Sequence, residues 1–395
     1  MIYVDVTSAC LLPLQSGIPR TTRGIHQLLV DHVTEISPLF WQPFRNTYTE
    51  LSPRARQLLD NPFANRRPSD QPPRDSTVPL LWASFSDLLR PWSKAVPLPR
   101  LMHAEDVLLL TSVFPDNRLE YLQKLAKSPG RKIAIFHDAI PLRDPNVADW
   151  EKKRHIKTLH LLSQMNTVLA VSAAAGKELR ELWVEHAIPF HASIAILPWP
   201  VPFHGPRPDF SEPPADKKRV LYVSRLKQLK NHATLFAACE ILWNQGLAFE
   251  LELIGCEDEA RESRAIADRL NQLRESGRSI FWCGHVTEEE LHEAYRQATF
   301  TVFPSLAEGF GLPIIESFWH GRPVICSNQG AVGELSQQGG CLTTDVTSAQ
   351  NLAEALKLLL QDSARCHALS QEAYNRPLRS WSDYWSDLKP LLETR

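Results

Sequence analysis

The chain has 395 residues, with 43 Lys and Arg against 45 Asp and Glu, a formal net charge of −2. Proteins that follow nucleic-acid phosphates need a basic excess, so this balance argues against nucleic acid as the main partner. The length predicts two domains with sizeable cores, and the absence of a long apolar run predicts that no segment spans a membrane.

The start of the chain and its cysteines predict a cytoplasmic protein. The sequence MIYVDVTSA has no basic stretch before its apolar residues, so we expect a first strand rather than a signal peptide. The seven cysteines form no Cys-x-x-Cys pair. Several of them (Cys239, Cys283 and Cys326) lie in apolar or strand-like surroundings, which predicts reduced core thiols.

Apolar runs that alternate with helical patterns predict an α/β domain in the N-terminal half. After a first strand over 2–6 and a loop over 11–20, we expect a helix from Thr21 to Glu35. Residues 45–100 are rich in proline, arginine and aromatic residues and predict irregular loops with one or two strands and helices. Further strands are expected at 107–111, 132–136, 167–172 and 193–197, and helices at 117–127 and 147–165.

A histidine follows one of these strands. His137 ends the strand 132–136 and opens the sequence HDAIPLRDP. Ligands of open α/β sheets bind beyond the carboxyl ends of strands, so His137 stands where chemistry is expected, although a structural histidine is also common there. Asp138 would orient the imidazole or serve an acceptor.

The helix over 147–165 begins with a basic cluster of Lys152, Lys153, Arg154 and Lys157. Such a cluster is usually a solvated face. The alternative is contact with anionic lipid or with a polyprenyl diphosphate acceptor at the inner membrane.

The proline-rich segment 198–217 predicts a linker, and a strand over 219–224 opens the second domain. Arg225 and Lys230 follow this strand, five residues apart. A guanidinium fork and an ammonium at this position suit a diphosphate, and the alternative is a solvated helix start. Strands at 249–254 and 280–284 end near Gly255 and Val286, after which Thr287 and Glu290 predict a capping box.

The stretch 302–335 predicts a strand, a glycine-rich loop, a helix and another strand. Gly309 and Gly311 allow close approach of a ligand, and Pro313 marks a helix start whose free amides favour an anion. Glu308 and Glu316 frame the loop with seven residues between them. Glu316 suits a ribose diol, or alternatively helix capping; Glu308 suits sugar hydroxyls.

The sequence EGFGLPIIE, followed by GRPVICSNQGAVGEL, resembles the Glu-x7-Glu signature of family-four retaining glycosyltransferases. The pair Arg225 and Lys230 resembles the diphosphate clamp of that family. FHDAIPLRDP resembles a segment of its members in bacterial polysaccharide and O-antigen synthesis, especially mannosyltransferases, in which the histidine contacts the transferred sugar. The resemblance implies a GT-B fold, with two Rossmann-like domains facing across a cleft, and a nucleotide diphosphate sugar bound without a metal or other cofactor.

The resemblance also implies roles for individual residues. Gly17 and Arg20, in the loop after the first strand, would approach the donor phosphates, although a plain turn and a solvated arginine are an equal alternative. Asp138 is the acceptor candidate. The catalytic candidates are Glu308, His137, Arg225 and Lys230, and the donor-binding candidates are Gly17, Arg20, Arg225, Lys230, Gly255, Val286, Glu308, Gly309, Phe310, Gly311, Leu312 and Glu316.

We therefore expect an acceptor-side domain over 1–200, a linker over 201–216, a nucleotide-sugar domain over 217–376, and a helix over 377–395 that crosses back to the first domain. The expected reaction moves a hexose, mannose from GDP-mannose before others, to a glycan or lipid-linked glycan. The alternatives are a UDP- or dTDP-sugar donor, a sugar epimerase of the same fold, or a non-catalytic nucleotide-sugar-binding protein.

Overall fold

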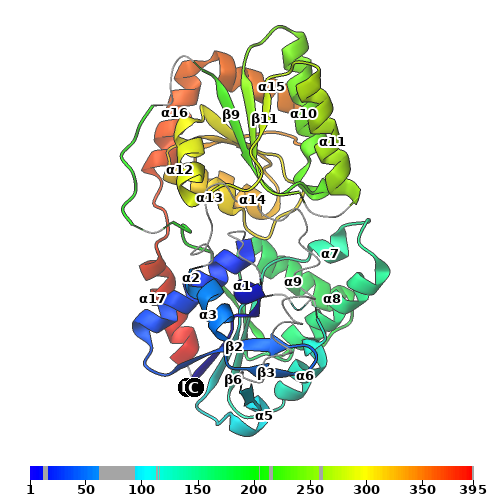
Figure 1. Cartoon of the computed structure of the whole chain (residues 1–395), viewed down its shortest axis with the longest axis vertical. Helices are drawn as coiled ribbons and strands as arrows, with labels where there is room; N and C mark the ends of the chain where they lie inside the picture. Colours follow the sequence, from blue (N-terminus) through cyan, green and yellow to red (C-terminus); the bar gives the residue numbers. More distant parts are fainter. Residues whose placement is uncertain are drawn as a thin grey trace. The chain divides into compact units, whose positions relative to one another are not determined.

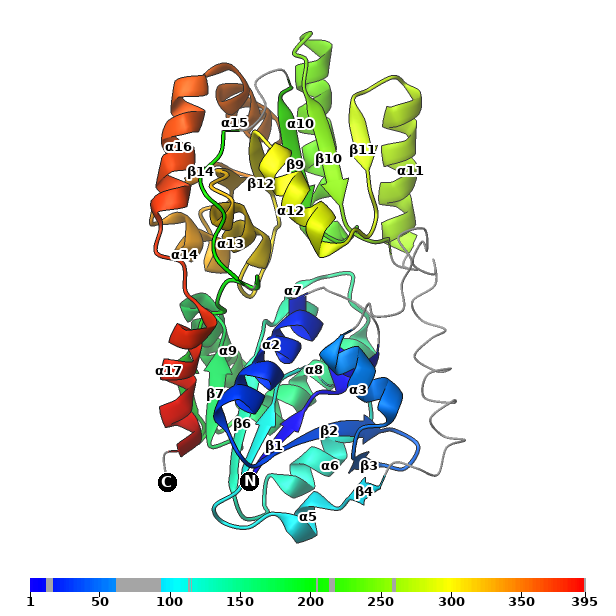
Figure 2. The same cartoon turned by 60° about the vertical axis from the view of Figure 1, so that its left-hand side comes forward.

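The computed structural model describes residues 1–11, 17–61, 94–112, 114, 116–203, 205–212, 217–257 and 261–393. These residues form two compact units (Figures 1 and 2). Unit 1 contains the described residues up to Pro202 and those from Arg379 onward, and unit 2 contains those from Phe203 to Leu378. Of the segment 45–100, for which irregular loops with one or two strands and helices were predicted, residues 62–93 lie outside the described residues.

The sheet of unit 1 has eight strands in the order β4-β3-β2-β1-β5-β6-β7-β8. The six strands β2, β1, β5, β6, β7 and β8 are parallel to one another. At one edge of the sheet, β3 pairs antiparallel with β2, and β4 pairs antiparallel with β3. Every residue of β5 and β7 is buried, as expected for parallel strands covered on both faces. The strands are β1 (Ile2–Asp5), β2 (Ile36–Gln42), β3 (Thr47–Thr49), β4 (Ala95–Val96), β5 (Val107–Leu110), β6 (Arg131–Phe136), β7 (Thr167–Ala170) and β8 (Ser193–Ile196).

The helices of unit 1 connect these strands. One boundary differs from the prediction, because α2 begins at Gly17 and not at Thr21. Pro19 lies in its first turn, where proline is tolerated, and the Thr21 hydroxyl donates to the Gly17 carbonyl at 3.2 Å. The helices are α1 (Thr7–Leu11), α2 (Gly17–His32), α3 (Pro53–Asp60), α5 (Leu98–Leu101), α6 (Arg118–Leu125), α7 (Ile140–Arg143), α8 (Asp149–Leu162) and α9 (Ala173–Glu185).

The last helix of the chain, α17 (Trp381–Glu393), belongs to unit 1 and packs on α2. Gly24 of α2 leaves the space that the Trp381 ring fills, since a Cβ on Gly24 would lie 2.1 Å from that ring. His32 and Trp385 stack at 4.7 Å. Figure 2 shows α17, in red, beside the other elements of unit 1.

Unit 2 has a sheet of six parallel strands in the order β11-β10-β9-β12-β13-β14. Its strands are β9 (Arg219–Val223), β10 (Glu250–Ile254), β11 (Ile280–Trp282), β12 (Phe300–Phe303), β13 (Val324–Cys326) and β14 (Cys341–Thr343). A 3-10 helix covers Gln228–Lys230, and the α-helices are α10 (His232–Asn244), α11 (Arg261–Glu275), α12 (Glu288–Gln297), α13 (Leu312–Trp319), α14 (Gly330–Ser336), α15 (Ala349–Gln361) and α16 (Ser363–Asn375).

The proline-rich segment before β9 forms no helix or strand among its described residues, but it is anchored to unit 2. Arg207 donates to four backbone carbonyls at the ends of α13 and α16, among them Trp319 at 3.0 Å and Tyr374 at 2.6 Å. Arg322 donates to the Ser211 carbonyl at 2.7 Å. The described linker residues from Phe203 onward therefore belong to the second unit, whereas Val201 and Pro202 belong to the first.

Two further expectations can be compared with the structure. Cys239 and Cys326 are buried thiols, but Cys283 is exposed, because it follows β11 at the edge of the sheet. Among the described residues, none of the helices combines the length and the apolar character needed to cross a lipid bilayer.

Candidate functional site

The sheet of unit 2 has a topological switch point between β9 and β12. The chain leaves β9 toward β10 on one side, and β12 is followed by β13 on the other side. Ligands of open α/β sheets bind beyond the carboxyl ends of strands at such a point. The loop after β9 carries Arg225 and Lys230, and the loop after β12 carries Glu308.

These two loops are joined by hydrogen bonds. The Leu306 amide and the Ser305 hydroxyl both donate to the Leu229 carbonyl, at 2.9 and 3.2 Å. The ammonium of Lys230 forms an ion pair with Oε1 of Glu308. The structure thus brings together two predicted catalytic residues that are 78 positions apart in the sequence.

The backbone of Lys230 is also fixed by a hydrogen bond. Its carbonyl accepts a hydrogen bond from the buried Tyr222 hydroxyl at 2.5 Å. Asn231 then adopts a left-handed backbone with φ of 59°, and its side chain donates to the Val346 carbonyl at 2.7 Å. Asparagine tolerates this conformation better than most residues, so it closes the turn before α10.

Arg225 and Gly255 lie in neighbouring loops of the same edge. The Arg225 side chain is exposed. A Cβ on Gly255 would lie 1.8 Å from the Ser224 carbonyl oxygen, so only glycine allows the loops after β9 and β10 to meet. This internal contact explains the glycine, and the predicted role of Gly255 in donor binding stays a prediction.

The glycine-rich loop leads directly into α13. Gly311 is the N-terminal cap with φ of +113°, and Pro313 lies in the first turn, as predicted. Gly309 and Phe310 are buried, whereas Leu312, the first helical residue, is half-buried. The first amides of α13 follow Glu308 along the chain after the glycine-rich loop, and the helix dipole favours an anion at this helix start.

Glu316 lies in the second turn of α13, not in the first, and is buried. Its Oε2 accepts a hydrogen bond from the Tyr295 hydroxyl of α12 at 2.8 Å. The capping alternative for Glu316 is therefore wrong. Tyr295 stacks on His320 with ring centroids 5.0 Å apart, and burial lowers the pKa of His320 to about 3. Sequence reasoning missed Tyr295, since no local pattern pairs it with Glu316.

Val286 is half-buried and precedes α12. The predicted capping box is confirmed: the Thr287 amide donates to Glu290 Oε2 at 2.7 Å, and the Glu290 amide donates to Thr287 Oγ1 at 3.2 Å.

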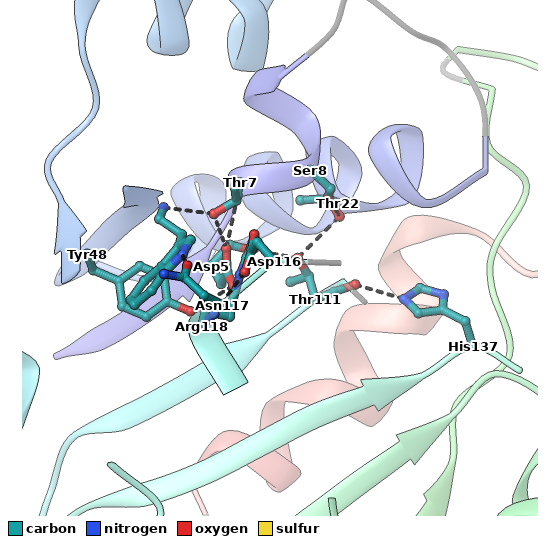
Figure 3. Close-up of polar contacts among 11 residues, drawn as sticks. Asp5, Thr7, Ser8, Thr22, Tyr48, Thr111, Asp116, Asn117, Arg118 and His137 are labelled. Carbon is teal, nitrogen blue, oxygen red and sulfur yellow. Dashed lines mark hydrogen bonds and ion pairs between the residues drawn. The ribbon is translucent and has the colours of Figure 1, made fainter. Parts of the chain in front are cut away.

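In unit 1, His137 directly follows β6 and is 7% exposed. Its Nε2 lies 2.9 Å from the Thr111 carbonyl, which only accepts, so Nε2 carries the proton. Burial lowers the pKa of His137 to about 4, so the ring is neutral at pH 7 and Nδ1 is an acceptor. Figure 3 shows His137 pointing to Thr111.

Thr111 itself connects three elements. Its hydroxyl donates to the Asp5 carbonyl of β1 at 2.6 Å and accepts from Thr22 of α2 at 3.2 Å. Asp138, the acceptor candidate, makes a local contact: its Oδ1 accepts from the Ile140 amide at 3.1 Å.

A buried ionic network lies at the same edge (Figure 3). Oδ2 of Asp5 accepts from Arg118 at 2.6 Å and from the Tyr48 hydroxyl at 2.9 Å. Arg118 also donates to Asp116 at 2.8 Å. Burial opposes the charge of Arg118, but the two carboxylates outweigh this effect and raise its pKa. Sequence reasoning missed this network, although the acidic residue at the end of the first apolar strand was a visible signal.

Gly17 and Arg20 lie in the first turn of α2, and residues 12–16 before them are outside the described residues. A Cβ on Gly17 would meet no described atom within 4 Å, so no contact within the described protein requires glycine there.

The basic cluster at the start of α8 is partly exposed, since Lys153 and Lys157 are exposed. Trp150 of the same helix is 63% exposed, and the Arg154 guanidinium lies over its ring at 4.9 Å.

With this geometry in view, the chain can be compared with known proteins. Residues 207–376 match the model of the glycosyl transferases group 1. The matched part, less than half of the chain, is similar to this family. The match contains Arg225, Lys230, Glu308 and Glu316, and it confirms the resemblance to family-four enzymes.

Known relatives extend this result. The chain is 24% identical over 361 residues to the serotype-specific mannosyltransferase WbdA of Escherichia coli, an alignment that covers 85% of this chain but 39% of that relative. Sucrose-phosphate synthase from Thermosynechococcus elongatus has a TM-score of 0.67 at 17% identity, covering 99% and 97% of the two chains. Anabaena HepE, solved with UDP and glucose, has a TM-score of 0.61 at 14% identity and covers 100% and 99%. These structures confirm the GT-B fold.

Proposed function

We propose that this chain transfers a glycosyl unit from a nucleotide diphosphate sugar to a hydroxyl acceptor, with retention of the anomeric configuration. The observation that carries the proposal is the Lys230–Glu308 ion pair at the β9–β12 switch point, beside the glycine-rich start of α13. A cation for a diphosphate and a carboxylate for sugar hydroxyls stand there side by side. The matched family supports the same reaction class.

The residues of unit 2 supply the donor chemistry in this proposal. Arg225, Lys230 and the amides that follow Gly309 stabilise the negative charge that grows on the leaving diphosphate. One well-placed donor of this kind is worth about 3–4 kcal/mol. Fixed cations in this role make a metal unnecessary. Glu316, oriented by Tyr295, accepts from the ribose diol, and Glu308 accepts from sugar hydroxyls.

The bond changes balance without an outside reagent. The bond from the anomeric carbon to the diphosphate oxygen breaks, and the acceptor oxygen bonds to that carbon on the same face. The acceptor proton passes to the departing phosphate. His137, neutral with Nε2 committed to Thr111, offers Nδ1 to a hydroxyl of the transferred sugar and orients it.

The donor proposed first is GDP-mannose, supported by the HDAIPL segment and by the similarity to the mannosyltransferase WbdA. A UDP-sugar is the second candidate, because HepE was solved with UDP and glucose. Calorimetric titration with GDP and UDP separates them. A preference for GDP of more than about tenfold, or about 1.4 kcal/mol, supports mannose, and a preference for UDP overturns it.

The proposed acceptor is a growing or lipid-linked glycan of a bacterial cell-surface polysaccharide. Exposed Trp150 and the basic residues around it offer a face for anionic lipid or for an acceptor diphosphate. Sedimentation with vesicles that contain anionic lipid tests this contact, and loss of binding in a Lys152→Glu, Lys153→Glu variant would locate it.

Turnover decides between the reaction classes. The assay measures nucleoside diphosphate released from the nucleotide sugar with and without a glycan acceptor. Release that depends on the acceptor supports the transferase. Conversion of the nucleotide sugar without an acceptor would indicate an epimerase, and tight binding without turnover would indicate a binding protein.

A further inference from the structure

Three aromatic rings of unit 1 form a column that begins with His137, the candidate sugar-contacting histidine. His137 stacks on Trp199 with ring centroids 5.9 Å apart and an interplanar angle of 26°. Trp199 stacks on Tyr384 of α17 at 5.6 Å and 14°. The column therefore connects the end of β6 to the last helix of the chain.

All three rings are buried, with Trp199 4% and Tyr384 1% exposed. The backbone of Trp199 is restricted by Pro200, which follows it. Just beyond, the Val201 amide donates to the Arg379 carbonyl at 2.9 Å, which ties this segment to the residues that lead into α17. Trp199 is thus fixed at its backbone and along one face of its ring.

The contacts of His137 define its orientation from two directions. The Thr111 carbonyl fixes the position of Nε2, and the Trp199 face restricts rotation of the ring about that hydrogen bond. With both contacts in place, Nδ1 points in one direction with one protonation state. With only the first contact, the ring is free to tilt, and a tilt of this kind displaces the acceptor lone pair.

We propose that Trp199 and Tyr384 are positioning residues for His137, through which α17 sets the direction of the Nδ1 acceptor toward the sugar. The inference rests on the proposed role of His137 in sugar binding. Neither residue touches the sugar in this account. Their effect passes through the histidine ring.

The chain offers matched controls for the test. Trp199→Leu and Tyr384→Leu remove one ring each from the column, whereas Trp199→Phe and Tyr384→Phe keep an aromatic face. Trp385→Leu removes a different stack of the same helix, the one with His32, and leaves the column intact. It therefore reports what loosening α17 does by itself.

Two measurements are made on each variant that retains a native circular-dichroism spectrum. The first is the ¹⁵N spectrum of protein labelled at histidine, in which the His137 resonances are assigned by their loss in His137→Gln. The wild type should show one tautomer, with the proton on Nε2. Trp199→Leu and Tyr384→Leu should keep this tautomer, because the Thr111 contact remains, but their His137 ring resonances should shift or broaden as the ring tilts. The Phe variants and Trp385→Leu should match the wild type.

The second measurement is turnover at saturating nucleotide sugar. Misplacing a contacting group by about 1 Å can cost up to about a hundredfold in rate, so a fall in kcat of about tenfold or more is expected for the two Leu variants of the column. Affinity for the nucleoside diphosphate should stay within about twofold, because the diphosphate site lies in unit 2. Rescue by Trp199→Phe should be nearly complete.

Unchanged His137 resonances and unchanged kcat in Tyr384→Leu would overturn the inference, even if Trp199→Leu does not fold. An equal loss in Trp385→Leu would also overturn it, because the effect would then belong to the helix as a whole. A wild type that turns over no nucleotide sugar, but whose His137 spectrum changes as expected, would instead overturn the proposed function and leave the ring positioning intact.

Discussion

The ammonium of Lys230 and the carboxylate of Glu308 are paired across the β9–β12 switch point, with 23% and 12% of their side chains exposed. Each group is therefore partly desolvated and satisfied by the other. A diphosphate that binds to Lys230 must displace or share this carboxylate. The pair keeps two reactive charges in place, but the carboxylate also repels the anion that the site is proposed to hold.

The first prediction concerns this repulsion. Glu308→Gln removes the negative charge but keeps the shape, so Lys230 is available to the diphosphate without competition. Affinity for the nucleoside diphosphate, measured by calorimetry, should equal or exceed that of the wild type. Turnover should fall more than about tenfold, or 1.4 kcal/mol in the barrier. If affinity falls together with turnover, Glu308 serves mainly to hold Lys230 in place.

The second prediction concerns the cations of the β9 loop. Arg225→Ala and Lys230→Ala should each reduce turnover more than about tenfold, because each removes a charge that stabilises the leaving diphosphate. Lys227, exposed in the same loop, provides the control, and Lys227→Ala should retain nearly full activity. Wild-type rates in either of the first two variants would refute the clamp.

The third prediction isolates the ribose contact of Glu316. Glu316→Ala should weaken binding of a nucleoside diphosphate, and Tyr295→Phe should weaken it less, since it removes only the donor that orients the carboxylate. The same titrations with a 2′,3′-dideoxynucleoside diphosphate should show no difference between wild type and Glu316→Ala. A difference that persists with the dideoxy compound would place Glu316 elsewhere in the site.

The fourth prediction concerns pH. Burial lowers the pKa of His137 from 6.5 to about 4, so the folded state holds the neutral ring while the unfolded state takes up a proton below 6.5. Stability is therefore complete above about pH 6.5 and is lost as the pH falls toward 4. Between about pH 7 and pH 5, His137→Gln should lose about 2 kcal/mol less of its free energy of unfolding than the wild type.

Urea unfolding at the two pH values provides the measurement. Other buried histidines, such as His232, contribute to the same trend, so the slope should decrease without vanishing. His191 has an exposed side chain, and its replacement by Gln provides the control. If the free energy of unfolding depends on pH identically in His137→Gln and in the wild type, His137 is not buried in its neutral form.

The fifth prediction concerns the ionic network of unit 1. Arg118→Ala leaves the buried carboxylate of Asp5 without its charge partner, which should cost about 3–5 kcal/mol of unfolding free energy. Arg143→Ala breaks an ion pair with Glu178 that is exposed, and it should cost less than about 1 kcal/mol. Equal losses in the two variants would show that the network does not hold unit 1 together.

Sequence patterns located the parts of the site that depend on neighbours in the chain. Lys230 and Glu308 lie in the segments that follow β9 and β12, and parallel strands place their carboxyl ends on one edge of the sheet. Their proximity could therefore be inferred from the sequence. The pairing of Tyr295 with Glu316 depends instead on how α12 and α13 pack. The same holds for the contact of Thr111 with His137, which requires the order of the strands.

The edge of unit 1 was the least predictable part of the fold. β2 contains Pro38, which lacks an amide donor and masks the strand pattern, and β3 and β4 are only three and two residues long. Strands of this kind form because the existing sheet provides a partner. Their own sequence carries too little signal to predict them.

The membership of α17 in unit 1 also affects how the protein is made. Unit 1 consists of a first chain segment that ends at Pro202 and a second segment that begins at Arg379. About 176 residues of unit 2 are synthesised between these two segments. At a translation rate of about 5–20 residues per second, the first part of unit 1 waits roughly 9–35 s for its last helix. During this interval the surface around Gly24 and Trp199 has neither Trp381 nor Tyr384 to cover it. The nascent chain therefore exposes, on the ribosome, an apolar surface that a chaperone can shield until the final turns emerge.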